Sequence, residues 1–302
     1  MRKREPSCTK RGSGVECAAI VVGVDGAEPS LAAVRWAAAE ADRRRVPLRM
    51  VMACHRPAPL TAFTSEPARK VADDVLRVAA REATTAAPGV VVEATATPDR
   101  PAAALLRAGA GAGMLVVGTR GRHAATAVVL GSVSRQVATQ ATCPVTVVRG
   151  SVHPAGGVLV GVDSDPRAAQ VVTAAFAEAR QRGCPLLAVR VIETPPTPSA
   201  IGTPPLMYDV AEVRRSLTDE ATRLVAAVGD RFPDVRWELH GVDGDAGRVL
   251  AHRSEDAQLV VVGSRGHGGL SGLLLGSVGL HLLHRAACPV LIHHEDTHVH
   301  LA

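Results

Sequence analysis

The sequence has few aromatic residues, few lysines and no paired cysteine motif, and each shortage disfavours a class of function. Only two Trp, one Tyr and three Phe occur in 302 residues, whereas single-strand nucleic-acid binders stack bases on aromatic side chains. Lysine occurs only at positions 3, 10 and 70, so no G-x4-G-K-[ST] phosphate loop is present. The six cysteines show no C-x-x-C spacing, which excludes a zinc ribbon and a dithiol redox motif. Nucleic-acid binding is therefore disfavoured.

Long apolar stretches are also missing. No run approaches the roughly 18–20 uncharged residues that a membrane-spanning helix needs. The first seventeen residues are basic and lack the apolar segment of a secretory signal. They carry five Lys or Arg against two Glu, which accounts for most of the net charge of +5. We therefore expect a cytoplasmic protein with no membrane partner, whose residues 1–17 form a basic disordered extension.

An internal repeat dominates the rest of the chain. The segment VVGTRG, ending at Gly121, recurs 145 residues later as VVGSRG, ending at Gly266. The tripeptides GSV and CPV recur at the same offset, and GVD recurs at an offset of 138. A second copy with extra residues before its glycine segment fits these offsets. The sequence thus predicts two tandem domains, at 18–150 and 155–293, followed by a His-rich tail at 294–302.

Each copy alternates short apolar runs with Ala-, Leu- and Arg-rich helical segments. The runs are continuous rather than alternating, which is typical of parallel strands covered by helices on both faces. Strands are expected near 18–24, 48–54, 90–96, 114–119 and 144–148, and again near 157–162, 186–192, 235–240, 258–263 and 289–293. Each copy is therefore expected to be a doubly wound, Rossmann-like α/β domain.

The glycine segments are candidate phosphate sites. Both copies read G-x2-G-x9-G-S, the first from Gly118 and Gly121 to Gly131 and the second from Gly263 and Gly266 to Gly276. Glycines at a strand end let the backbone approach an anion, and a helix that opens at Gly-Ser offers free N–H groups. A simple chain turn would explain one copy, but two copies with the same spacer favour phosphate binding.

An aspartate follows the first strand of each copy, at Asp25 and Asp163. Such an acid can accept hydrogen bonds from ribose hydroxyls. Capping of the next helix is an equally good explanation. Taken with the glycine segments, these aspartates suggest a nucleotide.

These motifs together resemble the universal stress protein family, in its tandem two-domain form. The resemblance rests on G-x2-G-x9-G-S in both copies, on GVDG at 23–26, GVDS at 161–164 and GSVS at 131–134, and on CPV in both last strands. It implies ATP as ligand, with or without Mg²⁺, and a five-stranded parallel sheet of order 3-2-1-4-5 in each domain. The ligand crevice would open between strands 1 and 4, where the order in which the chain adds strands to the sheet reverses direction.

The resemblance also assigns roles to residues. Asp25 and Asp163 would hold the ribose, and the backbones of Ala53 and Val191 would meet adenine. The phosphates would lie against the glycine segments and the helix starts that follow them, at Gly118, Arg120, Gly121, Gly131, Ser132 and Val133 and at Gly263, Arg265, Gly266, Gly276, Ser277 and Val278. For the two arginines, a solvated surface position is an equally good interpretation.

The copies differ, which predicts two sites of unequal affinity. The first lacks the glycines of the spacer 267–272, with Arg-His-Ala-Ala-Thr-Ala at 122–127 instead. The second has Gly279 and Ala168 where the first has Ser134 and Ser30. No side chain in the sequence dictates which base is bound. Nucleotides other than ATP, including cyclic ones, therefore stay open as ligands.

The expected function is nucleotide-dependent regulation of the stress response, with an unidentified protein partner and a possible homodimer. No lysine stands ready to assist phosphoryl transfer, so we expect no enzyme, or at most weak ATP hydrolysis. The alternatives are a slow ATPase or adenylyl-transfer enzyme, and a partner-binding scaffold without nucleotide. A metal or redox sensor is a further alternative that rests on Cys54 and on histidines 293, 294, 298 and 300. A disordered tail explains those histidines more simply.

Overall fold

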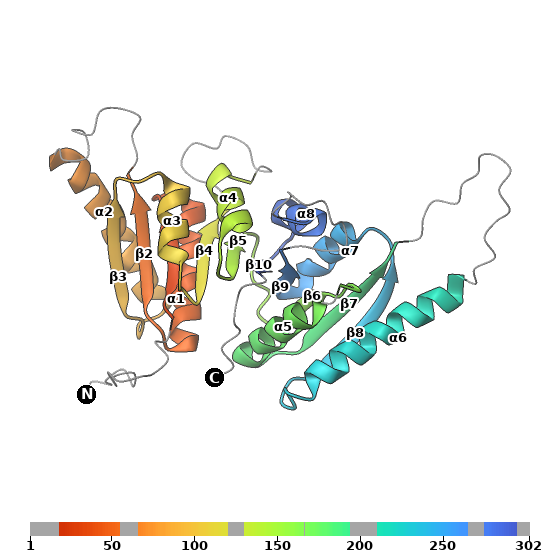
Figure 1. Ribbon diagram of the computed structural model, residues 1–302. Helices are drawn as coiled ribbons and strands as arrows, with labels where there is room; N and C mark the ends of the chain where they lie inside the picture. The colour runs from red at the N-terminus through yellow and green to blue at the C-terminus, as the bar shows by residue number, and fades with distance from the viewer. Residues whose placement is uncertain are drawn as a thin grey trace, which may run out of the picture. The chain divides into compact units, whose positions relative to one another are not determined.

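The chain folds into two compact units, Met1–Val148 and Arg149–Ala302. The computed structural model describes residues 18–54, 66–119, 130–165, 167–193, 210–264 and 275–294 (Figure 1). Each unit alternates strands and helices along the chain, as the sequence predicts.

The two units contain matching series of elements. In the first unit these are β1 (Ile20–Val24), α1 (Glu28–Arg44), β2 (Leu48–Ala53), α2 (Glu66–Ala86), β3 (Val92–Thr97), α3 (Pro101–Gly109), β4 (Met114–Gly118), α4 (Ser132–Gln140) and β5 (Val145–Val148). In the second they are β6 (Gly157–Gly161), α5 (Ala168–Arg182), β7 (Leu186–Ile192), α6 (Val210–Gly229), β8 (Trp237–Asp243), α7 (Ala246–Arg253), the 3-10 turn Ser254–Asp256, β9 (Ala257–Gly263), α8 (Ser277–Arg285) and β10 (Val290–His293).

Each unit is built on a parallel sheet. Among the described residues the strand order is β3-β2-β1-β4-β5 in the first unit and β8-β7-β6-β9-β10 in the second. Val22 on the central strand β1 lies beside Met50 of β2 and Val116 of β4. The predicted fold class and the predicted order 3-2-1-4-5 are therefore confirmed. The winding reverses between β1 and β4 and between β6 and β9. In open α/β sheets the ligand crevice lies at the carboxyl ends of such strands, and we call this edge of each unit its crevice.

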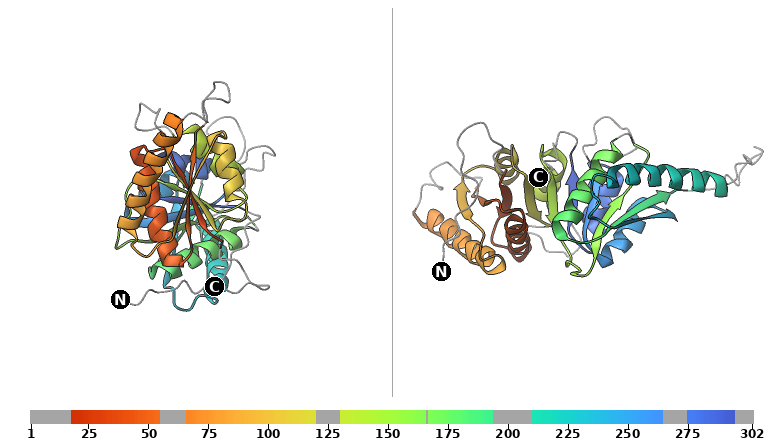
Figure 2. Two further views of the ribbon diagram at one scale, coloured as in Figure 1. Left: turned by 90° about the vertical axis from the view of Figure 1, so that its left-hand side faces the viewer. Right: turned by 90° about the horizontal axis from the view of Figure 1, so that it is seen from below.

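Helices cover both faces of each sheet. In the first unit α1 packs beside α2 and α3 beside α4, and the left view of Figure 2 shows the two pairs on opposite sides of the sheet. In the second unit the pairs are α5 with α6 and α7 with α8. The inner strands β1, β4, β5, β9 and β10 are almost wholly buried, for example Val21, Leu115 and Leu259 at 0% exposure. Burial on both faces explains why these strands read as continuous apolar runs.

The first helix of each unit carries the same buried acid. Glu40 on α1 pairs with Arg43 and with Arg44, whose Nε lies 2.7 Å from its carboxylate. Glu178, at the equivalent position on α5, pairs with Arg182 one turn later. A buried carboxylate is tolerated only when it is paired in this way. The duplicated sequence therefore reproduces its internal ion pairs as well as its strands.

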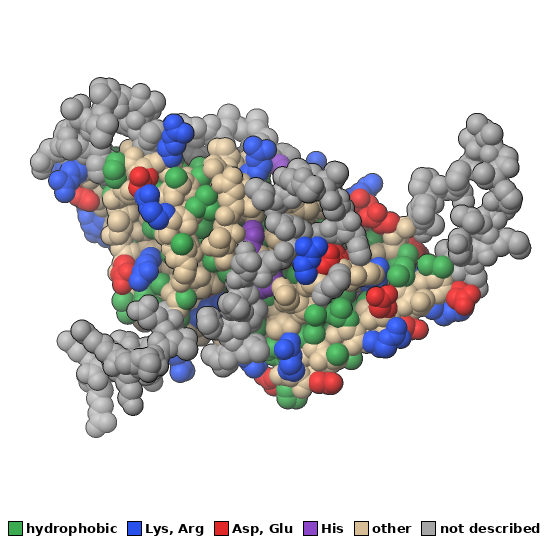
Figure 3. All heavy atoms as spheres, in the orientation of Figure 1, with side chains coloured by type: hydrophobic (Ala, Val, Ile, Leu, Met, Phe, Trp, Pro, Cys, Tyr) green, Lys and Arg blue, Asp and Glu red, His purple; other side chains and the backbone are tan. Residues whose placement is uncertain are grey.

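The described surface carries interspersed charges of both signs. Figure 3 shows blue and red side chains side by side on the visible face, including along α6. One of these pairs joins Arg214 on α6 to Asp243 at the end of β8, at 2.9 Å. In the described part of the chain, no helix is long and apolar enough to cross a bilayer.

Candidate functional site

The predicted ribose acceptors lie at the expected strand ends, where each holds a tight turn. Asp25 follows β1 directly, and its Oδ1 accepts a hydrogen bond from the Ala27 N–H at 3.0 Å. Asp163 follows β6, and its Oδ1 accepts one from the Asp165 N–H at 3.1 Å. Such Asx turns are common for aspartate in loops. The turn therefore fixes the direction of each carboxylate, a group that can accept about four hydrogen bonds.

The alternative of helix capping is not realised by these two aspartates. The N-cap residue of α1 is Ala27 and that of α5 is Arg167, and neither helix has a side-chain cap. Asp25 and Asp163 are both half-buried at the edge of their crevices. Their role as ribose ligands stays a prediction.

Gly118, the last residue of β4, has a structural reason to be glycine. A Cβ at this position would lie 2.7 Å from the carbonyl carbon of Pro29, in the first turn of α1. No backbone atom can be approached that closely, so only glycine lets α1 begin against the end of β4. The backbone nitrogen of Ser30, whose hydroxyl accepts from the Asp25 N–H, would lie 3.2 Å from the same Cβ. The residue therefore serves the fold first, and it thereby shapes the crevice.

The loop after each glycine segment returns to the strand end through the same hydrogen bond. The Gly131 N–H donates to the Thr119 carbonyl at 2.7 Å, and the Gly276 N–H donates to the Ser264 carbonyl at 2.9 Å. The residues between, including Arg120, Gly121, Arg265 and Gly266, lie outside the described residues. Their predicted phosphate contacts stay predictions.

Helices α4 and α8 begin in the same way. Each follows an extended glycine, has an exposed serine as its first residue, at Ser132 and Ser277, and has no side-chain cap. Val133 and Val278 come next and are half-buried. The first N–H groups of a helix have no partner within it, so both helices present free donors at the strand edge. This arrangement suits an anion such as a phosphate.

The backbones predicted to meet adenine also lie at this edge. Ala53 is the last residue of β2, and the next N–H, that of Cys54, donates to the Thr97 carbonyl at 2.8 Å. Val191 is the penultimate residue of β7 and pairs with Val242 of β8. Both are half-buried. The carboxyl ends of the strands thus bring together all the predicted site residues that the structure describes.

The serine differences between the units now have a physical meaning. Ser134 is buried and its hydroxyl donates to the Gly118 carbonyl at 2.6 Å, which fastens α4 to β4. The Ser30 hydroxyl donates to the Ala27 carbonyl at 2.9 Å and accepts from the Asp25 N–H at 3.3 Å. Gly279 and Ala168 cannot make these bonds. The second crevice is therefore braced by fewer hydroxyl groups than the first.

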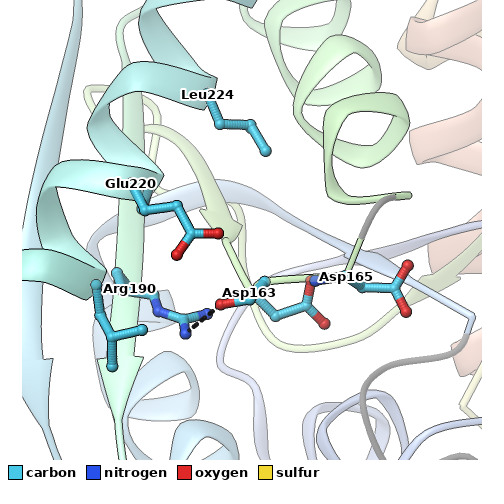
Figure 4. Close-up of a pocket in the computed structure, with 8 residues that line it drawn as sticks. Asp163, Asp165, Arg190, Glu220 and Leu224 are labelled. Atoms are coloured by element: carbon cyan, nitrogen blue, oxygen red, sulfur yellow. Dashed lines mark hydrogen bonds between the residues drawn. The ribbon is translucent and has the colours of Figure 1, made fainter.

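The second unit contains a pocket that the sequence analysis missed. It has a volume of about 130 Å³ and lies beside Asp163 (Figure 4). Arg190 of β7 enters it and donates to the Val162 carbonyl at 3.2 Å and to the Ser164 hydroxyl at 2.7 Å. The lining residues come from the β6–α5 turn, β7 and α6: Asp163, Ser164, Asp165, Arg190, Leu217, Glu220, Ala221 and Leu224.

A comparison of the two copies contains a signal for this pocket, although it does not give the pocket itself. At the offset of 138 Arg190 corresponds to Met52, and at the offset of 145 Glu220 corresponds to Val75. Two apolar positions of the first copy are thus charged in the second. Only their meeting in space shows that the two changes belong together.

Asp99 in the loop after β3 and Asp245 in the loop after β8 are two further acids at the carboxyl ends of strands, and both are engaged locally. Asp99 accepts a hydrogen bond from the Thr97 hydroxyl and pairs with Arg107. The Thr97 hydrogen bond and then Arg107 lower the pKa of Asp99. Asp245 caps α7 and accepts from the Arg248 N–H at 2.8 Å. The described residues contain no group of three or more His, Cys, Asp or Glu arranged to hold a metal ion.

Two of the four tail histidines belong to the folded unit, which corrects the tail interpretation for them. His293 is the last residue of β10 and is 3% exposed, and His294 is 7% exposed. His293 occupies the position of Val148 in the first unit, and burial lowers its pKa. His298 and His300 lie outside the described residues.

The buried thiols are poorly suited to redox sensing. Burial raises the pKa of Cys143 to about 11 and that of Cys288 to about 12. Burial, followed by the charge of Asp73, also raises the pKa of Cys54. The thiolate is the reactive form of cysteine, so all three are less reactive than a free thiol.

Comparison with known proteins gives consistent matches along the chain. The model of the universal stress protein family matches residues 18–149 and 156–294. A universal stress protein of Mycobacterium tuberculosis strain H37Rv is 33% identical over 291 residues, which cover 90% of this chain and 96% of that protein. A universal stress protein structure from Archaeoglobus fulgidus has a TM-score of 0.66 at 19% identity and covers 92% of this chain and 97% of its own. A universal stress protein solved in complex with cAMP covers 44% of this chain and 96% of its own, with 26% identity and a TM-score of 0.35.

Proposed function

Because the chain belongs to the universal stress protein family, we propose that it is an ATP-binding regulator of the stress response that acts in the cytoplasm. ATP would bind in both units, and nucleotide occupancy would change the protein's shape or its protein partners. A ligand shifts such an equilibrium only by its different affinity for the two states.

One observation carries this proposal: the two crevices repeat the same backbone geometry. In each, an aspartate is held by a turn at the end of the first strand, and a glycine N–H returns to the residue after the fourth strand. An uncapped helix begins there with an exposed serine. The residues fit a nucleotide, since the carboxylates suit ribose hydroxyls and the free helix N–H groups suit phosphates.

In this proposal the residues bind and orient the nucleotide and do not hydrolyse it. Asp25 and Asp163 would hold the ribose, and the first turns of α4 and α8 would hold the phosphates. The three lysines of the chain lie at positions 3, 10 and 70, away from the glycine segments in sequence. The crevice therefore offers little cationic help for phosphoryl transfer among its described residues.

Isothermal titration of ATP into the full chain, stripped of nucleotide, tests the proposal. We expect two binding sites and no ADP by a luminescence assay. Asp25→Ala and Asp163→Ala should each remove one site. Asp25→Asn keeps an oxygen that can accept from the Ala27 N–H, so it separates loss of ribose binding from loss of the turn.

Asp42→Asn is the matched control, since Asp42 lies near the C-terminal end of α1, away from the crevice where α1 begins. Absence of heat with every nucleotide would overturn the proposal and favour the scaffold alternative. ADP formation that is abolished by Ser277→Ala would favour the enzyme alternative instead.

A further inference from the structure

The two units differ in the side chains that lie between the turn after their first strand and the helix after their second strand, which is α2 in the first unit and α6 in the second. In the first unit Val75 of α2 fills this place, since its methyl group lies 3.0 Å from where a Cβ of Gly26 would be. In the second unit Ser164 and Glu220 stand at the equivalent positions, and Arg190 replaces Met52. The result is the pocket of about 130 Å³ beside Asp163.

The charged groups of this pocket are positioned without pairing with each other. Hydrogen bonds to the Val162 carbonyl and the Ser164 hydroxyl hold the Arg190 guanidinium in the lining of the pocket. Glu220 reaches in from α6 on the other side (Figure 4), and no ion pair joins it to Arg190. A fixed donor and an acceptor thus face the same space, and together they suit a ligand that carries both an acceptor and donors.

The remaining wall is apolar and comes from Leu217, Ala221 and Leu224 on α6. Pockets that enclose a whole drug-sized ligand measure roughly 300–1,000 Å³, so this one is sized for one part of a nucleotide. Carboxylates outnumber the guanidinium in the lining, which disfavours the phosphates there. A flat heterocycle can lie against the apolar wall with its polar edge toward the charged pair.

We infer that this pocket reads the base of the nucleotide bound in the second unit, and that it selects guanine. Guanine presents an acceptor, O6, next to two donors, N1–H and the 2-amino group. Arg190 would donate to O6, as arginine does in guanine recognition, and the Glu220 carboxylate would accept from both donors. Adenine offers that carboxylate only its 6-amino group. The inference rests on the proposed function, because it requires a nucleotide whose ribose lies at Asp163.

The first unit lacks this selectivity in the same scheme. Met52 and Val75, at the positions of Arg190 and Glu220, offer no side-chain hydrogen bonds to a base. The inference therefore gives the second unit a preference for guanine, with ATP still bound there but more weakly, and leaves the first unit without selection at these two positions. It also gives a chemical basis to the prediction of unequal sites.

The test is titration of GTP, ATP and inosine triphosphate into the nucleotide-stripped full chain. One site should bind GTP about tenfold more tightly than ATP, which is near the lower end for one good bidentate contact. Inosine triphosphate, which lacks the 2-amino group, should bind that site more weakly than GTP. Glu220→Gln and Arg190→Met should each bring the GTP/ATP ratio toward one.

Asp219→Asn is the matched control, since this exposed acid is next to Glu220 and does not line the pocket. It should keep the preference. Glu220 is itself exposed, so its substitution leaves the fold intact. Equal affinities for GTP and ATP at both sites, or a preference that survives Glu220→Gln, would overturn this inference while nucleotide binding sensitive to Asp163→Ala still stands. Absence of any nucleotide binding would overturn the proposed function as well.

Discussion

The hydroxyl of Ser134 fastens the start of α4 to the end of β4, and its removal should loosen the first crevice. Ser134 is 5% exposed and donates to the buried Gly118 carbonyl at 2.6 Å. In Ser134→Ala the hydrogen bond is lost and the carbonyl loses this partner, which costs roughly 1–3 kcal/mol. Alanine recovers about 0.5 kcal/mol of helix propensity. We therefore expect a net destabilisation of about 1–2 kcal/mol.

The second unit provides the reciprocal experiment. A Cβ at Gly279 would lie 3.1 Å from the Leu275 Cδ1, the end of a flexible side chain, and 4.0 Å from the Gly263 carbonyl oxygen. Gly279→Ser places a hydroxyl within reach of that carbonyl and removes a glycine from a helix, so it should stabilise the second unit by up to about 1 kcal/mol. Gly279→Ala adds the Cβ without the hydroxyl and serves as the control.

Hydrogen exchange read peptide by peptide is the suitable assay, because a chain of two units need not unfold in one transition. Ser134→Ala should speed exchange in α4 and β4 and leave α8 and β9 unchanged. Gly279→Ser should slow exchange in α8. The reasoning is refuted if Ser134→Ala changes protection in α4 by less than about 0.5 kcal/mol, which is the size of an ordinary surface substitution.

Three further predictions follow from buried groups. Glu178→Ala removes the carboxylate that pairs with the buried Arg182 side chain, so thermal unfolding of the second unit should show a loss of about 3–5 kcal/mol, and a loss below 1 kcal/mol would contradict the pairing. Alkylation of native protein at pH 8 should be very slow at Cys143 and Cys288, whose thiols ionise only near pH 11 and 12, and rapid labelling would contradict their burial. Burial lowers the pKa of His293, so this residue is more easily protonated in the unfolded chain than in the folded one. The free energy of unfolding should therefore fall as the pH drops below about 6.5. His293→Val should reduce that fall, and a pH dependence of melting that is the same in this variant would contradict the role of His293.

The sheet order could be predicted because it depends on short-range signals that the chain states twice. Apolar runs such as Ile20–Val24 and Met114–Gly118 are long enough for one strand each, and two-sided burial makes them continuous. The repeated spacing from Gly118 to Gly131 fixes where β4 ends and α4 begins. These signals need no knowledge of long-range packing.

The charged pocket could not be predicted in this way, since it depends on the register of a helix against a strand. Arg190 and Glu220 are thirty positions apart, and their meeting requires that α6 places Glu220 over β7. His293 was misjudged for a related reason. A polar residue at the end of an apolar run looks like the start of a tail, whereas strand pairing with Gly263 and packing bury it.

The two crevices share their backbone and differ in their side chains, and this difference follows a consistent direction. In the first unit, hydrogen bonds from the Ser30 and Ser134 hydroxyls and the packing of Val75 against the turn hold the crevice rigid. The second unit lacks both hydroxyls and has Arg190 and Glu220 facing an open pocket instead. A braced site gains affinity because less ordering is needed on binding, whereas a site with unpaired polar groups gains selectivity because a ligand that fails to pair with them binds poorly. Under the proposed function, duplication of one scaffold yields one nucleotide site tuned for occupancy and one tuned for the identity of the ligand.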